Sequence, residues 1–202
     1  SSGGKAADGR ELEYRDFAVL YRTNAQSRNF EDAFSRNDIP YRVLGGLRYY
    51  DRKEIKDMMA YMRLVHNSAD DLSLVRIINE PKRGIGDKTV EKLRALADVR
   101  GQSMFDALGD EDVLYALPAK AITSVAEMLR AIKECAEEKQ NLRVSDIYDA
   151  LLVRTGYLKA LEDQNTVEAD GRIENLLEFK SVIFEYEKDD PGLTLEDFME
   201  RV

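Results

Sequence analysis

The sequence predicts a mainly α fold, in which a helical subdomain follows a small α/β fragment. Apolar residues recur at helical spacing through most of the chain after residue 47. Two short apolar runs near the N-terminus, residues 16–21 and 39–44, have the composition of strands and flank one helical pattern. Two glycines, Gly84 and Gly86, fall between two predicted helices, as in a helix-hairpin-helix element.

The N-terminal part of the chain is expected to contain a linker and an incomplete α/β layer. Residues 1–15 are polar and charged, which favours a linker or a disordered segment, and no apolar stretch suggests a signal peptide. Residues 16–46 then predict strand, helix and strand, the helix covering 27–37. Two strands of this length do not form a stable sheet by themselves. We therefore expect the sequence to be a piece of a larger protein.

The remainder of the chain predicts helices only. Gly45-Gly46 is a break of the kind found at hinges. Asp87 is a suitable N-cap for the helix that follows the two-glycine turn. The last pattern reaches Val202 without a stop signal, so a cut end is expected there. Helices are predicted for residues 52–65, 70–78, 88–98, 103–108, 119–138, 144–155, 157–162 and 166–188, and from 195 onward.

Charge and composition exclude several classes of protein. The 202 residues carry a net charge of −9, but residues 110–202 hold 22 acidic and 11 basic residues, whereas residues 1–109 hold 17 and 19. A local anion site in the first half thus stays open, and so does a protein partner for the acidic half. The single cysteine and single histidine exclude a disulfide framework and a Cys or His metal cluster. No apolar run is long enough to span a membrane. We expect a cytoplasmic protein without a metal site.

The turn around Gly84-Ile85-Gly86 is the sharpest local signal. Glycines allow a tight turn and a close approach of the backbone to a surface. The helix that follows presents free N–H groups and the positive end of its dipole, which suits a phosphate. Additional donors are Lys82, Arg83, Lys88 and Thr89. Such contacts would position duplex DNA without reading its bases. The alternative is an ordinary helix–helix turn with solvated lysines, and these residues alone leave both interpretations open.

Two further clusters combine polar and aromatic residues. Residues 42–56 surround the glycine pair and include Arg48, Arg52 and two tyrosines, a mixture that suits nucleic acid. The alternative, which the pattern alone favours, is that the tyrosines pack against the core while the charges pair locally. Residues 21–28, with Arg22 and Asn24, follow the first predicted strand, where ligands gather in α/β sheets. A polar loop whose Ser27 caps the next helix is the alternative there.

Taken in order, residues 17–28, 45–57 and 78–86 resemble the UvrD/PcrA/Rep family of superfamily 1 DNA helicases. The resemblance implies that residues 16–46 are part of the second RecA-like motor domain, 2A, and that residues 47–202 are the helical 2B subdomain. It also implies a 3′–5′ helicase of DNA repair or replication, in which 2B contacts duplex DNA and regulates unwinding.

The same resemblance implies roles for individual residues. Gly84, Gly86 and Thr89 would contact duplex DNA, and Lys82, Arg83 and Lys88 would supply charge beside them. Arg22 and Asn24 would lie near the single-strand track of 2A. Arg48 and Arg52 would lie at the hinge and the adjoining DNA face.

The sequence departs from the family's motor. The phosphate loop and the acidic Mg²⁺ motif are absent, so no catalytic residue and no cofactor is expected in this chain, whereas ATP and Mg²⁺ are expected for the parent protein. The alternative function is a non-enzymatic helical module whose acidic half docks a protein partner. Salt dependence of DNA binding separates the two, because phosphate contacts weaken as salt rises.

We predict that this chain alone does not hydrolyse ATP, because no loop in it cradles phosphates. Phosphate release by the purified chain, with and without single-stranded DNA, should equal the buffer background. Turnover that survives further purification and follows the protein peak would contradict the prediction.

Overall fold

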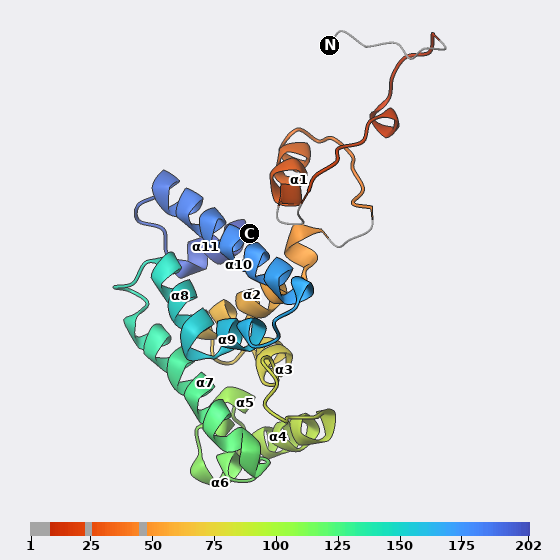
Figure 1. Ribbon diagram of the computed structural model, residues 1–202. Helices are drawn as coiled ribbons and strands as arrows, with labels where there is room; N and C mark the ends of the chain where they lie inside the picture. Colours follow the sequence, from red (N-terminus) through yellow and green to blue (C-terminus); the bar gives the residue numbers. More distant parts are fainter. Residues whose placement is uncertain (1–8, 23–25, 45–47) are drawn as a thin grey trace. The chain divides into compact units, whose positions relative to one another are not determined.

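The computed structural model describes residues 9–22, 26–44 and 48–202, and these residues are mostly helical (Figure 1). The chain forms two compact units, Ser1–Arg52 and Lys53–Val202. Each unit is described by itself. The two units divide the chain a few residues after the boundary at 46/47 that the sequence suggests.

The N-terminal unit is organised around one α-helix, α1 (Ser27–Arg36). Two short 3-10 helices, Tyr14–Asp16 and Tyr49–Asp51, belong to the same unit. Glu31 of α1 is buried, and its carboxylate accepts hydrogen bonds of 3.1 and 3.2 Å from the backbone N–H of Tyr49. This contact fixes the second 3-10 helix against α1.

The two predicted strands are not formed in this structure. Residues 16–21 and 39–44 lack strand structure, and apart from an isolated bridge at Glu11 the described residues contain no strand. Phe17 is 65% exposed and Leu20 is 93% exposed. The prediction of a paired α/β fragment is therefore wrong for the described residues. Strand-forming side chains need neighbouring strands and a covered face, and residues 16–21 have neither among the described parts of the chain.

The C-terminal unit is built around α2 (Lys53–His66), which is buried on most of its surface. A helix buried all round belongs to the centre of a fold. Several other helices pack against it, as Figure 1 shows for the middle of the unit: α3 (Asp71–Ile77), α7 (Ala119–Glu138), α8 (Val144–Arg154), α10 (Val167–Asp189) and α11 (Leu195–Arg201).

The remaining helices complete the unit at two places. α4 (Asp87–Arg100) packs on α5 (Met104–Leu108), which also contacts α6 (Glu111–Leu114). α9 (Tyr157–Glu162) packs between α8 and α10. Buried aromatic side chains fill the space between α8, α10 and α11, where Tyr148, Phe179 and Phe198 are fully covered.

The predicted helices are confirmed along this unit, with two differences. The short helix α6 was not predicted, because its four residues are too few to show a period. α4 begins at Asp87 itself, so Gly86 and not Asp87 is its N-cap. Gly86 has extended backbone angles, φ −102° and ψ 171°, which place it just outside the helix.

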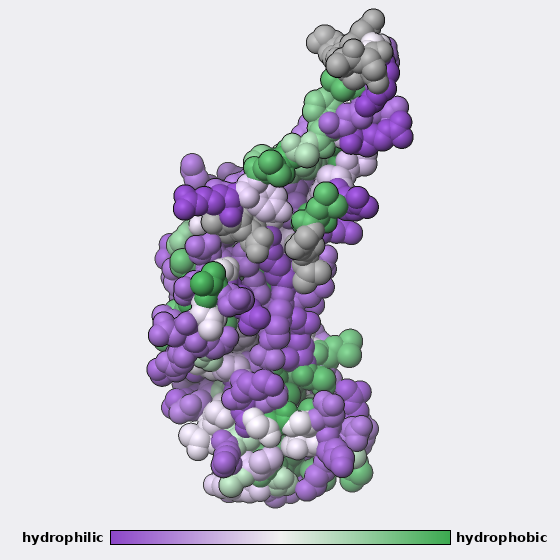
Figure 2. All heavy atoms as spheres, turned by 45° about the vertical axis from the view of Figure 1, so that its right-hand side comes forward, coloured by the Kyte–Doolittle hydropathy of each residue, from purple (hydrophilic) through white to green (hydrophobic). Residues whose placement is uncertain are grey.

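The visible surface of the helical unit is mainly hydrophilic, with apolar residues in small separate patches (Figure 2). Exposed large apolar side chains include Leu72, Val99, Val153 and Leu177, which come from four different helices. Single exposed apolar residues are normal on soluble domains. Among the described residues, none of the helices has the length and apolar character that crossing a membrane requires.

Two glycine substitutions should change stability in opposite directions. Gly171 lies inside α10, and a Cβ there would meet no atom within 4 Å, so Gly171→Ala should raise the free energy of unfolding by about 0.4–1 kcal/mol. Gly101 ends α4 with φ +64°, so Gly101→Ala should lower it by about 1–2 kcal/mol. Urea unfolding followed by circular dichroism measures both. Equal shifts of the same sign would contradict this account of the two glycines.

Candidate nucleic-acid interface

The turn between α3 and α4 places two glycines outward and one apolar side chain inward. Gly84 and Gly86 are exposed, and a Cβ at either position would meet no protein atom within 4 Å. Ile85 between them is only 3% exposed and anchors the turn. Gly84 has φ +78°, a left-handed conformation that favours glycine. The backbone here is therefore open to a ligand, whereas its central side chain belongs to the core.

Asn79 holds this turn from the end of α3. Its side-chain oxygen accepts hydrogen bonds from the backbone N–H of Arg83 at 2.8 Å and of Ile85 at 3.1 Å. The two donors lie on either side of Gly84. One side-chain oxygen thus accepts both backbone hydrogen bonds that flank the tightest part of the turn, and asparagine side chains commonly make such contacts with nearby backbone.

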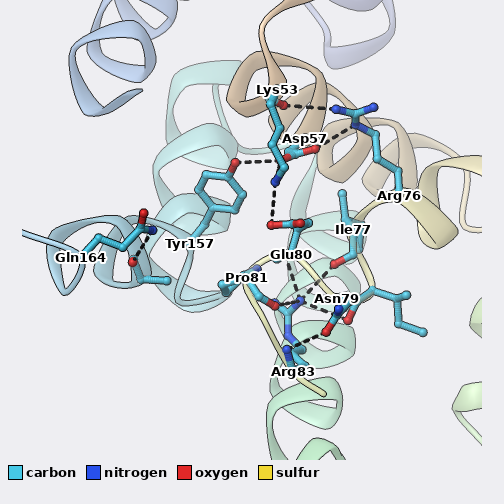
Figure 3. A network of polar contacts seen from close by, with 12 residues as sticks. Lys53, Asp57, Arg76, Ile77, Asn79, Glu80, Pro81, Arg83, Tyr157 and Gln164 are labelled. Atoms are coloured by element: carbon cyan, nitrogen blue, oxygen red, sulfur yellow. Dashed lines mark hydrogen bonds and ion pairs between the residues drawn. The ribbon is translucent and has the colours of Figure 1, made fainter. Parts of the chain in front are cut away.

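Arg83 points into the protein and not toward solvent. It is 5% exposed, and its Nη1 donates to four backbone carbonyls at 3.0–3.3 Å. Its Nη2 donates to the Tyr61 hydroxyl at 3.0 Å and to the Thr155 carbonyl at 3.1 Å. Figure 3 shows the guanidinium enclosed by the end of α3. The four carbonyls belong to Ile77, Ile78, Glu80 and Pro81.

This position changes the interpretation of Arg83. The sequence suggests a phosphate contact, but both terminal nitrogens of the Arg83 guanidinium donate to groups inside the protein, and the side chain is 5% exposed. Burial raises the pKa of Tyr61 above its ordinary value, although Arg83 opposes the shift. Tyr61 therefore stays protonated and donates to the Glu80 carbonyl. The two side chains belong to the support of the turn.

A second polar cluster lies beside the first, around the buried Asp57 of α2 (Figure 3). Its carboxylate contacts Nζ of Lys53 at 3.1 Å, Nε of Arg76 at 2.9 Å and the Tyr157 hydroxyl at 2.8 Å. Lys53 also pairs with Glu80 at 2.7 Å. Burial, and next the charge of Asp57, raise the pKa of Tyr157, so it acts as a neutral donor. This cluster joins α2, α3 and α9 close to the turn.

The exposed part of the turn carries the remaining predicted contacts. Lys82 and Lys88 are exposed and form no ion pair with another described residue, and Thr89 is half-buried in the first turn of α4. No side chain caps this helix N-terminus. Asp87 is also exposed and adds one negative charge there. An uncapped helix N-terminus between two lysines is suited to an anion.

The predicted residues of the N-terminal unit divide into exposed and buried ones. Arg22 and Arg48 are exposed, the latter 3.9 Å from Asp51. Arg52 is buried, donates to the Ser27 hydroxyl at 2.7 Å and lies 5.1 Å from the ring centre of Tyr49. Arg52 thus fixes the 3-10 helix onto α1. Asn24 and the Gly45-Gly46 pair lie outside the described residues.

Residues with potential metal or nucleophilic chemistry contribute no site here. Within the described part of the chain, no group of three or more His, Cys, Asp or Glu side chains could hold a metal ion. Cys135 is buried in α7, and burial raises the pKa of its thiol, which disfavours the thiolate.

Sequence patterns did not reveal the residues that support the turn. Asn79 follows directly after the helix predicted for residues 70–78, and Tyr61 and Thr155 are 18 and 76 positions away from it in the sequence. The available signal was the sequence Asn-x-x-x-Arg-Gly, in which an asparagine precedes a positive-φ glycine. Its meaning depends on side-chain direction, which spacing does not give.

The fold and the turn define a class: a helical module that presents a glycine turn at an uncapped helix N-terminus. Comparison with known proteins identifies the family. The UvrD-like helicase C-terminal domain matches residues 5–202, and the chain belongs to this family of UvrD/PcrA-like superfamily 1 helicases.

Curated relatives agree with this assignment. The chain is 45% identical over 178 residues to the ATP-dependent DNA helicase PcrA of Staphylococcus aureus and 44% identical to that of Staphylococcus epidermidis. The match covers 88% of this chain and 24% of each relative. The chain therefore spans about a quarter of the length of the helicases it matches.

The helix that leads into the turn should show a defined pH dependence. Asp70 caps α3, accepting hydrogen bonds from the Ser73 N–H at 3.0 Å and hydroxyl at 2.6 Å. Burial raises the pKa of Asp70, but the hydrogen bonds from Ser73 outweigh it, so the pKa lies below 3.8 in the folded state. Ionised Asp70 thus stabilises the fold above the unfolded pKa of about 3.9, and this contribution is lost as pH falls through the lower folded pKa.

We expect Asp70→Ala to cost about 1 kcal/mol of unfolding free energy at pH 7 and less below pH ~4. Asp70→Asn keeps an acceptor oxygen and should cost only a small part of this at pH 7. Urea unfolding of the wild type and of both variants, at pH 7 and at pH 3.5, gives the cost of each substitution at each pH. A cost of Asp70→Ala that grows with acidity would refute the assigned direction.

Proposed function

We propose that this chain is the duplex-contacting and regulatory part of a UvrD/PcrA-like 3′–5′ DNA helicase that acts in DNA repair or replication. In this proposal residues 47–202 form the 2B subdomain, and residues 16–46 belong to the 2A motor domain. The family match over residues 5–202 supports it. The relatives are named ATP-dependent DNA helicases, so ATP and Mg²⁺ would act in the parent protein.

The observation that carries the proposal is the open backbone at Gly84 and Gly86. A phosphate group could approach this backbone closely, because no Cβ stands in the way. The uncapped N-terminus of α4 would supply N–H donors and the positive end of the helix dipole. Lys82 and Lys88 would add charge, and the Thr89 hydroxyl one more donor. Contacts of this kind position duplex DNA without reading its sequence.

The contacts would be rigid because the core holds the turn. Ile85 is buried, and Arg83 and Asn79 fix the backbone on both sides of Gly84. In this proposal Arg83 contributes to DNA binding only through the turn. The acidic second half of the chain would face away from the phosphates and limit nonspecific coating of DNA.

The N-terminal unit would contribute to the single-strand track. Arg22 and Arg48 are exposed and could reach phosphates, and Asn24 would accompany Arg22 in this role. Arg52, enclosed between Ser27 and Tyr49, would act indirectly by holding the 3-10 helix that follows Arg48.

We predict weak, salt-dependent duplex binding centred on the turn, with a Kd of about 10⁻⁴–10⁻⁶ M. Gly86→Ala is the sharpest test, since Gly86 is extended and a Cβ there disturbs no protein atom. Alanine is a clearly poorer N-cap than glycine, so Gly86→Ala should lose up to about 1 kcal/mol of unfolding free energy. The variant should still fold, because no protein atom is displaced, and it should bind duplex more weakly. Gly84→Ala should weaken binding and also strain the turn. Thr89→Ala should cost about 0.5–1.5 kcal/mol of binding energy.

The titration uses a fluorescent duplex of random sequence at two salt concentrations. Gly171→Ala, another glycine with open space around it, is the matched control and should bind like the wild type. Two results would refute the hypothesis that this turn contacts DNA: equal duplex affinity of wild type and Gly86→Ala, or a duplex affinity that does not change with salt concentration. The second result would favour a helical protein-interaction module instead.

A further inference from the structure

We propose that Asn79 and Arg83 are positioning residues of the duplex-binding turn, although neither side chain would touch DNA. They fix the backbone of Gly84-Ile85-Gly86 and the start of α4 in the DNA-competent geometry before DNA arrives. This inference rests on the proposed function and deepens it. Its basis is one pair of hydrogen bonds and one buried cation.

The pair of hydrogen bonds belongs to Asn79. Its side-chain oxygen accepts from the N–H groups of Arg83 and Ile85, at 2.8 and 3.1 Å. These two amides flank Gly84, whose φ of +78° is the conformation that the chain would most readily abandon. Loss of the acceptor leaves two partly buried N–H groups without a partner, which is unfavourable for the folded turn. The single oxygen thus selects the turn conformation.

The buried cation is the Arg83 guanidinium. Its acceptors are neutral oxygens, and the carbonyls of Ile77 and Ile78 belong to the C-terminal end of α3. The Thr155 carbonyl ends α8, so the cation lies at two helix C-termini. Helix C-termini carry partial negative charge, which stabilises a cation there. The planar fork of arginine reaches several acceptors at once, whereas the single ammonium of lysine does not.

Together these contacts connect the turn to the core of the helical unit. Arg83 connects it to Tyr61 on the central helix α2 and to the end of α8. Gly86 follows three residues later as the N-cap of α4. The direction of the α4 N-terminus is therefore fixed by buried contacts and not by the exposed loop. A preformed turn avoids the ordering cost that a flexible loop would incur when it binds.

The test compares Asn79→Ala with Asn79→Asp in the full chain. Amide hydrogen exchange of Ile85 reports the turn without DNA. In Asn79→Ala we expect the Ile85 amide to exchange at least about tenfold faster than in the wild type, which corresponds to about 1.4 kcal/mol. In Asn79→Asp we expect near-wild-type protection of this amide, because the carboxylate can accept the hydrogen bonds from the Arg83 and Ile85 N–H groups. Asn141→Ala, an exposed asparagine in the loop before α8, is the matched control.

Duplex titration of the same proteins separates positioning from general stability. Asn79→Ala should bind about tenfold more weakly than the wild type, with an unchanged salt slope because the phosphate contacts are the same in number. Thr194→Ala removes the N-cap of α11 far from the turn and should lower stability by about 1 kcal/mol without weakening binding. Arg83→Lys should behave like Asn79→Ala if it folds.

Three results would overturn the positioning role: wild-type protection of Ile85 in Asn79→Ala, rapid exchange with unchanged duplex affinity, or the same loss of affinity in Thr194→Ala. Failure of the proposed function is distinguishable from these results. If the wild-type chain binds no duplex, the proposed function fails, and the exchange rates still decide whether Asn79 holds the turn.

Discussion

The helical unit depends on the buried guanidinium of Arg83, which forms no ion pair with a carboxylate among the described residues. Removing a guanidinium from water is costly, and a carboxylate is the usual compensation. At Arg83 the compensation comes from backbone carbonyls at the ends of α3 and α8 and from the Tyr61 hydroxyl. Some of these carbonyls already have a partner: that of Ile77 also accepts from the Glu80 N–H at 2.9 Å, and that of Glu80 accepts from the Tyr61 hydroxyl. The guanidinium therefore shares its acceptors with the hydrogen bonds of the surrounding backbone and side chains.

The same interaction explains why the turn can remain open on its outer side. A tight connection between two helices usually keeps its shape through its own side chains, which occupy the surface. Here Asn79, Arg83 and Ile85 hold the turn from the inside, and the outer side needs only glycine backbone. The neighbouring cluster around Asp57 continues this support toward α2 and α9 through Glu80. Rigidity and accessibility are therefore compatible in one short segment.

Sequence patterns predicted the helices well, because period and stop signals are local properties. They predicted the glycine turn for the same reason. They failed at the strands, since residues 16–21 and 39–44 have strand composition, but the described residues contain no neighbouring strand for them to pair with. The DNA roles of Arg83 and Arg52 came from the family resemblance, whereas the pattern of residues 42–56 alone favoured local pairing of the charges. Whether an arginine faces carbonyls or solvent depends on distant partners such as Thr155, which no local pattern contains.

An acidic chain can still present a DNA site, because phosphates respond to the field at short range. At physiological salt the screening length is about 8 Å, so an exposed acidic residue farther than this from the turn would act only weakly on a phosphate there. The groups that count are Lys82, Lys88, Asp87 and the N-terminus of α4. The charges of the two lysines and the positive end of the α4 dipole together exceed the negative charge of Asp87. Arg83 adds little to this field, because the dipoles of the surrounding carbonyls offset its charge. In the proposed function, attraction from two lysines and one helix N-terminus would hold a phosphate only lightly and without regard to base sequence.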